Sequence, residues 1–342
     1  MEQKKIRVKD LHLYAETFDG DVAKGRNTFI GGSDVGTIMG VNPYKSAYEL
    51  YLEKTEQIER ENIDDKLQIK LGHKMEQIVA ELYEEETGKK VQKQNKSFKC
   101  KEFPFLVGHI DRKVQGRKKG LEIKTTSSFN KTDYKEGEIP PSHYFQCLFY
   151  MMITGMHDWD LATLRDNNNF YITHIAWDEE LAQDMLDEIL HFWNCVETKT
   201  WDKGLDGSES TSQALEKAYP AAETTSNESN MIAIQESSLP IPFVEYTNVN
   251  KSLKELEEIK KSFENNIKQL MGDSEYAILE DGEKRFAIKW ATATRSGGYD
   301  TKKFLEDNPT SELGTKYKKA DTKYRRFSIK EVKPKVKELE NK

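Results

Sequence analysis

The sequence predicts an α/β chain, with helices and strands mixed along its first 200 residues and a smaller α+β module behind them. Three segments carry this prediction: an amphipathic helix over residues 74–87, two strand-like runs around a basic turn near residue 116, and an almost wholly apolar helix over residues 142–154. A central sheet flanked by helices is the layered arrangement that buries the apolar side chains of all three.

Each helix has its own signal. In the first, apolar residues recur at spacings of three and four, and Gly88 ends the pattern. The positions that share this face are Met75, Ile78, Val79, Leu82 and Tyr83. The second helix follows Pro140 and Pro141, which favour a helix start, and its apolar character on all sides predicts burial.

The two strand-like runs predict a β-hairpin. FLVGHIDRKV, residues 105–114, leads into Gln115–Gly116, and LEIKTT, residues 121–126, leads out of the basic turn. If these runs pair, Asp111 lies on one strand and Glu122 on its neighbour. Glu122 and Lys124 then point to one face, because successive side chains of a strand alternate.

The C-terminal region differs in composition and charge. A connector rich in Gly, Ser, Thr and Pro precedes a helix pattern from Leu253 to Leu270, the strand pair YAIL and RFAIKWATA around Asp281–Gly282, and a last strand, YRRFSIK. From Tyr246 onward, 22 basic residues face 17 acidic ones, so this part carries +5 and the preceding residues −12 of the total of −7. We therefore predict three parts: residues 1–200, a connector over 201–245, and a small basic module over 246–342.

Composition limits the cellular setting. The longest apolar stretch, residues 144–156, is interrupted by polar residues and is shorter than the ~20 residues that span a bilayer. No apolar segment follows the charged N-terminus, and the three cysteines contain no C-x-x-C pair. We expect a cytoplasmic protein with reduced cysteines in its core.

Asp111, Glu122 and Lys124 suggest metal chemistry on phosphates. Two buried carboxylates are costly unless a cation neutralises them, and oxygen ligands suit Mg²⁺ or Mn²⁺. A lysine beside such a metal stabilises negative charge on a phosphate. The spacing alone also fits an ordinary surface hairpin with solvated charges, because the pattern is loose.

Four short motifs in a fixed order resemble a known family. They are Gly72-His73-x-x-Glu76, Gly108-His109-Ile110-Asp111, Glu122-Ile123-Lys124 and Gln146-x-x-x-Tyr150. This succession resembles the RecB-type nucleases of the PD-(D/E)XK superfamily, and residues 26–198 resemble the YqaJ-type phage recombinases related to λ exonuclease. The resemblance implies a restriction-endonuclease-like core with a central mixed sheet flanked by helices. Two departures are an isoleucine where the superfamily name leads one to expect proline before Asp111, and the absence of the four-cysteine cluster of the iron–sulfur members.

The resemblance implies roles for individual residues. Asp111 and Glu122 would hold Mg²⁺ or Mn²⁺, with the Ile123 carbonyl as a further ligand, and Lys124 would act beside the attacked phosphate. Glu76 would be an accessory acid that contacts the metal through water or orients Lys124. Gln146 would position water or phosphate, although a core amide is the alternative. Some relatives use a histidine at the place of His73 as a metal ligand, and its role here stays open.

Arg26 and Ser33 form a further candidate site. Gly31-Gly32-Ser33-Asp34 precedes helix-like sequence, so we expect Ser33 or Asp34 to cap a short helix. In λ-type exonucleases an arginine and a serine at this spacing resemble the pocket for a terminal 5′-phosphate. The alternative is simple helix capping beside a surface arginine.

The resemblance thus implies a metal-dependent 5′ to 3′ exonuclease that acts on the ends of double-stranded DNA and leaves 3′ single strands for recombination. It further implies a RecT- or Bet-like annealing partner, a homotrimeric ring and a phage or prophage origin. Five basic residues near the predicted hairpin fit DNA binding: Arg112, Lys113, Arg117, Lys118 and Lys119. The alternatives are a sequence- or structure-specific DNA endonuclease, or a non-catalytic DNA-binding recombination mediator on the same fold.

Overall fold

The computed structural model describes residues 6–17, 25–62, 65–127, 138–219, 235–239, 241–295 and, for the backbone alone, 322–332. It divides the chain into two compact units, Met1–Met231 and Ile232–Lys342. Each unit is described by itself below. Short 3-10 turns occupy Val8–Asp10, Arg26–Thr28 and Glu236–Ser238.

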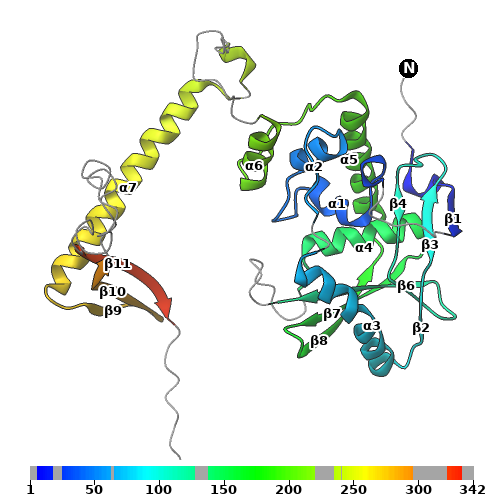
Figure 1. Cartoon of the computed structure of the whole chain (residues 1–342), viewed down its shortest axis with the longest axis horizontal. Helices are drawn as coiled ribbons and strands as arrows, with labels where there is room; N and C mark the ends of the chain where they lie inside the picture. Colours follow the sequence, from blue (N-terminus) through cyan, green and yellow to red (C-terminus); the bar gives the residue numbers. More distant parts are fainter. Residues whose placement is uncertain are drawn as a thin grey trace, which may run out of the picture. The chain divides into compact units, whose positions relative to one another are not determined.

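A five-stranded mixed sheet forms the centre of the N-terminal unit, as predicted (Figure 1). Its strands lie in the order β2 (Val91–Lys93), β5 (Arg112–Val114), β6 (Lys119–Thr126), β7 (Asp158–Arg165) and β8 (Asn169–Ala176). β6 and β7 are parallel and the other neighbours antiparallel. A parallel pair needs a long crossover, which the apolar helix α4 (Pro141–Thr154) supplies.

The hairpin forms, but its first strand is shorter than predicted. Only β5 pairs with β6, around a turn that contains Gly116 in the left-handed region. The preceding β4 (Val107–Gly108) joins a second sheet with β1 (Leu13–Thr17) and β3 (Lys96–Cys100). The run predicted as one strand therefore breaks between two sheets, and Asp111 lies in this break, directly before β5.

Helices cover both faces of the five-stranded sheet (Figure 1). α3 (Leu67–Thr87) packs its buried side chains against β6 and β7 on one face. α4 lies on the other face, with α1 (Gly32–Ile38), α2 (Ala47–Lys54) and α5 (Glu179–Thr198) beyond it. α3 begins before the predicted start. Its first turns carry Leu67 and Leu71, which are exposed and so add nothing to the buried face on which the prediction was based.

Two glycines permit close packing around the site. A Cβ on Gly120 of β6 would overlap the indole ring of Trp159 on β7. A Cβ on Gly32 would lie 2.6 Å from the Tyr150 ring, so a side chain there would push α1 away from α4. These contacts fix the strand and the helix that carry the candidate site residues.

Residues 201–219 begin the region predicted as a connector, but they lie in the N-terminal unit. α6 (Glu209–Ala218) contacts α2, and the Ser210 hydroxyl lies 2.5 Å from a Glu49 carboxylate oxygen and accepts from the Ser46 amide at 2.8 Å. This helix was not predicted, because its short sequence is mostly polar.

The C-terminal unit contains the predicted helix, hairpin and last strand. α7 (Phe243–Met271) is followed by β9 (Tyr276–Asp281) and β10 (Lys284–Arg295), with Gly282 in the left-handed region at the turn. β11 (Thr322–Val332) completes an antiparallel sheet in the order β11-β10-β9. Among the residues described, no helix combines the length and the apolar character needed to cross a bilayer.

Candidate active site

The two faces of β6 carry different kinds of side chain: apolar ones on one face and the candidate catalytic ones on the other. Leu121 and Ile123 point into the apolar cluster beneath α3. Glu122 and Lys124 point to the opposite face, where Glu122 contacts Gln146 of α4. The alternation of a β-strand thus places a carboxylate and an ammonium group side by side at the end of the crossover helix.

Asp111 joins them from the short segment between β4 and β5. Arg112 pairs with Leu121, so Asp111 follows at the level of Glu122 on the neighbouring strand. A carboxylate oxygen of Asp111, Oδ2, accepts a hydrogen bond from the Ile123 amide at 2.9 Å. The structure therefore brings together Asp111, Glu122 and Lys124, which the sequence separates by up to 13 positions.

The two carboxylate oxygens of Glu122 differ in their hydrogen bonds. Oε1 accepts from Lys124 Nζ at 2.7 Å and from Gln146 Nε2 at 2.7 Å. Oε2 is buried and has no hydrogen-bond partner among the described residues, while Glu122 as a whole is 2% exposed. A buried carboxylate oxygen without a partner is costly, and a bound cation would relieve that cost.

The electrostatics of the site also favour a cation. Burial and the negative charge of Glu122 raise the pKa of Asp111 well above its usual range. Burial lowers the pKa of Lys124, but Glu122 and Asp111 outweigh burial, so the pKa of Lys124 is raised and the lysine stays charged. Two carboxylates and one ammonium group leave one excess negative charge when all three are ionised. Oxygen donors of this kind fit a hard divalent ion.

Glu76 lies near the carboxylates but pairs with arginine. Its carboxylate forms an ion pair with Arg112, and Arg112 also donates to the Asp111 carbonyl at 2.8 Å. Through Arg112, Glu76 thus stabilises the segment between β4 and β5 that carries Asp111. Among the described residues, Lys124 Nζ forms its ion pair with Glu122, at 2.7 Å, and not with Glu76.

Arg26 and Ser33, which the family resemblance placed in one candidate site, are in contact. Arg26 Nη2 donates to the Ser33 hydroxyl at 2.7 Å, and Arg26 Nε is buried without a hydrogen-bond partner in the described part of the chain. The short helix expected after this turn is α1. Gly31 rather than Ser33 or Asp34 occupies its N-cap position, but the Asp34 side chain caps the helix from its first turn by accepting from the Gly31 amide at 3.2 Å.

Comparison with known proteins decides the family. Residues 23–157 match the YqaJ-like viral recombinase domain. The chain is 32% identical to the uncharacterized protein YqaJ of Bacillus subtilis (strain 168) over 310 residues, which cover 90% of this chain and 92% of the relative. The chain belongs to the YqaJ family. This confirms the family resemblance predicted from the four motifs.

Solved structures similar to this YqaJ-family chain include two exonucleases. The alkaline exonuclease LHK-Exo from Laribacter hongkongensis is 19% identical, with a TM-score of 0.41, over 51% of this chain and 90% of that one. A phage-related exonuclease from Haemophilus somnus 129PT is 12% identical, with a TM-score of 0.39, over 50% of this chain and 94% of that one.

Two of the five basic residues predicted to attract DNA are engaged inside this YqaJ-family unit. Arg112 is 3% exposed and pairs with Glu76. Lys119 is 6% exposed and contacts Asp158 and Asp160 at 2.8 and 2.7 Å. The prediction is wrong for both, because acidic partners far away in the sequence neutralise them. The remaining three are at least partly exposed.

Two further residues of the YqaJ-family site were missed in the sequence. His143 lies three positions before Gln146, on the same side of α4. Burial and the charge of Lys124 lower the pKa of its imidazole to about 3. Its Nδ1 is buried and has no hydrogen-bond partner among the described residues. Lys54 is buried and donates to Asp34 at 2.9 Å and to the Arg26 and Phe29 carbonyls at 2.5 Å. The i, i+3 spacing could have indicated His143. No sequence signal indicates Lys54. His73 is exposed on α3.

Proposed function

We propose that this protein is a metal-dependent exonuclease that degrades double-stranded DNA from its ends, in the 5′ to 3′ direction, and leaves 3′ single strands for recombination. The observation that carries the proposal is the convergence of Asp111, Glu122 and Lys124 around a buried oxygen of Glu122 that has no partner in the described chain. Membership of a viral recombinase family supports it.

The donor set fits Mg²⁺, or Mn²⁺ in its place. Asp111 and Glu122 would supply carboxylate oxygens, and the Ile123 carbonyl a further ligand. When bound, such an ion polarises a phosphate and makes water a better nucleophile. Asp111 and Glu122 both offer oxygen ligands. Their like charges repel each other, so binding a divalent cation between them is more favourable than filling the site with water.

The chain's own residues would then act on the DNA. Lys124 keeps its proton and presents positive charge to the attacked phosphate, which stabilises the charge that develops there. Gln146 Nε2 donates to Glu122 Oε1 at 2.7 Å and to the Tyr150 hydroxyl at 3.2 Å, which holds Glu122 in place. To position water or phosphate directly, Gln146 would exchange its contact with Tyr150 for one with the substrate. Glu76 positions Asp111 through Arg112 rather than by touching the substrate.

Arg26 and Ser33 support the choice of an exonuclease over an endonuclease. The Arg26 guanidinium group lies beside the Ser33 hydroxyl, and its buried Nε has no hydrogen-bond partner among the residues that the structure describes; such a group can receive a terminal 5′-phosphate. Lys54 holds the backbone of this loop through two carbonyls, so the pocket is formed before substrate arrives. An endonuclease has no use for such a pocket.

The proposal is tested with DNA substrates that differ only at their ends. Linear duplexes with 5′-phosphate, the same duplexes with 5′-hydroxyl, and closed circles are incubated with the protein and Mg²⁺. We expect rapid digestion of the first, slow digestion of the second and none of the third. Efficient cutting of circles would support the endonuclease alternative, and binding without digestion of any substrate would support the non-catalytic mediator.

We further propose the setting that the family resemblance implies: a homotrimeric ring around DNA, a RecT- or Bet-like annealing partner, and work in the cytoplasm of a bacterial host. The division into a nuclease domain over 1–200, a connector over 201–245 and a basic module over 246–342 is also a proposal. Two truncations, after Thr200 and after Tyr219, test its first boundary: equal digestion by both supports an end at 200, whereas loss in the shorter chain alone assigns α6, which contacts α2, to the nuclease domain. Digestion by the chain truncated after Tyr219 would show whether the C-terminal unit is needed for activity, and its sedimentation would show whether that unit is needed for oligomer formation.

A further inference from the structure

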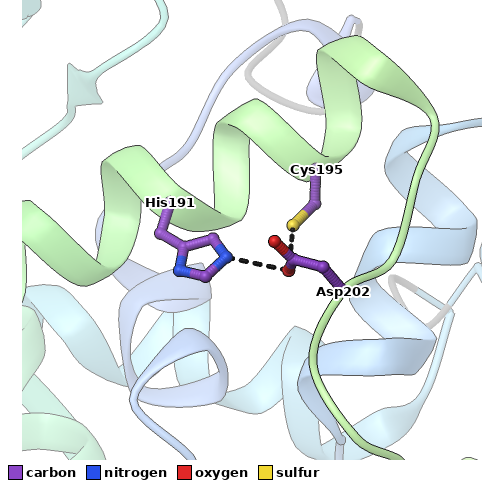
Figure 2. A group of neighbouring side chains, drawn as sticks. All are labelled: His191, Cys195 and Asp202. Carbon is purple, nitrogen blue, oxygen red and sulfur yellow. Dashed lines mark hydrogen bonds and ion pairs between the residues drawn. The ribbon is translucent and has the colours of Figure 1, made fainter.

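Away from the candidate active site, three side chains of types that can hold a metal ion lie together at the end of α5 (Figure 2). His191 and Cys195 are one helical turn apart, and Asp202 approaches them from the segment after the helix. One carboxylate oxygen, Asp202 Oδ1, lies 2.8 Å from His191 Nε2 and 3.1 Å from Cys195 Sγ. Nitrogen, sulfur and oxygen donors thus converge on one point.

The fold holds these three donors together without a ligand. α5 ends at Thr198, and Lys199, whose backbone lies in the left-handed region, caps the helix and turns the chain back. The Trp201 ring then packs against Tyr51 and Phe192, with ring centroids 5.2 and 6.3 Å apart. Because Trp201 is fixed in this aromatic cluster, its neighbour Asp202 is held beside the last turns of α5.

We propose that His191, Cys195 and Asp202 bind a zinc-type divalent cation, with water as the fourth ligand. Zinc prefers N, S and O donors in a tetrahedron, at ~2.0 to 2.3 Å from the ion. Ligand atoms at those distances lie somewhat further apart than they do here, so binding requires the side chains to open slightly. The Cys195 thiol proton is released to solvent as the sulfur–metal bond forms, and neutral His191 binds through Nε2.

Burial and charge support a separate role for this cluster. Cys195 is 1% exposed, and its thiol donates to Asp202 Oδ1 at 3.1 Å, so the proton that a cation would replace lies between two of the proposed ligands. The side chains of His191 and Asp202 are 44% and 54% exposed, which leaves an entry path and room for water. The bound ion would join α5 to the segment that leads into α6.

The other candidate cluster offers a contrast. Asp158, Asp160 and His174 also lie within reach of one another. There, however, Lys119 contacts both carboxylates, and the Tyr83 hydroxyl donates to Asp160 at 2.7 Å. A lysine already supplies the positive charge, so this cluster has no need of a metal.

Cobalt titration of the full chain tests the proposal, because Co²⁺ bound to a thiolate shows a charge-transfer band in the near ultraviolet that oxygen ligands do not give. The carboxylates proposed to hold the ion at the candidate active site do not give this band. Cys147→Ser is the control for that site and should keep the band, because Cys147 lies next to Gln146 on α4 and has Glu122 and Asp111 among its charged neighbours. We expect one equivalent of thiolate-bound Co²⁺ per chain, displaced by Zn²⁺, with the band lost in Cys195→Ser and kept in the matched control Cys100→Ser. His191→Asn and Asp202→Asn change exposed side chains and should fold; each should weaken Co²⁺ binding by about tenfold or more.

No charge-transfer band in the wild-type chain overturns the proposal, and so does a band that survives Cys195→Ser. If Cys195→Ser does not fold, the two exposed variants decide: unchanged Co²⁺ affinity in both rejects the site. Asp111→Asn serves as a further control, since it should leave the band intact whether or not the chain is a nuclease.

Discussion

Replacing Asp111 by asparagine should stabilise the metal-free protein and abolish DNA hydrolysis. Side chains opposite one another on neighbouring strands lie ~5 Å apart. Two negative charges at that separation repel by about 3 kcal/mol at an effective dielectric constant near ~20. Lys124 offsets part of this repulsion, so we expect Asp111→Asn to gain about 1 to 2 kcal/mol in free energy of unfolding at neutral pH. Asparagine still accepts the hydrogen bond from the Ile123 amide.

The gain should depend on metal and on pH. A carboxyl group whose folded pKa is raised lowers stability as pH rises through that pKa, so the advantage of Asp111→Asn is largest at neutral pH and shrinks as the pH falls. With saturating Mg²⁺ the order should reverse, because only the wild type gains binding energy from the ion.

Urea unfolding in EDTA and in Mg²⁺ measures both effects. A Trp290→Phe background removes the tryptophan of β10, so that fluorescence reports the N-terminal unit. Asp184→Asn, an exposed carboxylate on α5, is the matched control and should change neither curve. A variant Asp111→Asn that is less stable than wild type in EDTA would refute the reasoning that the two carboxylates repel each other in the folded chain.

Three further predictions address the site and the sheet. Lys124→Ala should reduce Mg²⁺-dependent DNA hydrolysis by about a thousandfold or more with DNA binding retained, as measured by product release and fluorescence anisotropy; unchanged hydrolysis would place the chemistry elsewhere. Arg26→Ala should lower the preference for 5′-phosphorylated over 5′-hydroxyl ends by about tenfold, and an equal loss on both ends would remove Arg26 from the pocket. Gly120→Ala should cost about 1 to 3 kcal/mol in free energy of unfolding, since its methyl group overlaps Trp159; the combination Gly120→Ala with Trp159→Leu should recover part of that loss in the same urea assay.

Local patterns predicted the parts of the fold that depend on neighbours in sequence. The hairpin turn near Gly116 and the apolar helix after Pro140 were found because turn residues and periodicity are local signals. The break between β4 and β5 was not found, because each short strand is fixed by a different partner strand. Periodicity carries no information on which strand a residue will pair with.

The candidate site shows the same division. Glu122 and Lys124 could be placed on one face from strand alternation alone, and the structure has them 2.7 Å apart. The burial of Arg112 and Lys119 could not be anticipated, since their acidic partners lie 36 and 39 or more residues away. Charge counted along a sequence therefore overstates the positive surface near the hairpin.

The alternation along β6 separates the integrity of the fold from the chemistry of the site. Leu121 and Ile123 pack in the apolar cluster beneath α3. Glu122 and Lys124 point to the other face, toward α4. If the chain is the exonuclease proposed above, substitutions on the second face should yield a folded protein that binds a DNA end without hydrolysing it. Such a substrate trap would let end-bound complexes be isolated and imaged. It would also reveal whether partner proteins are recruited by the bound end itself or only by the single strand that digestion exposes.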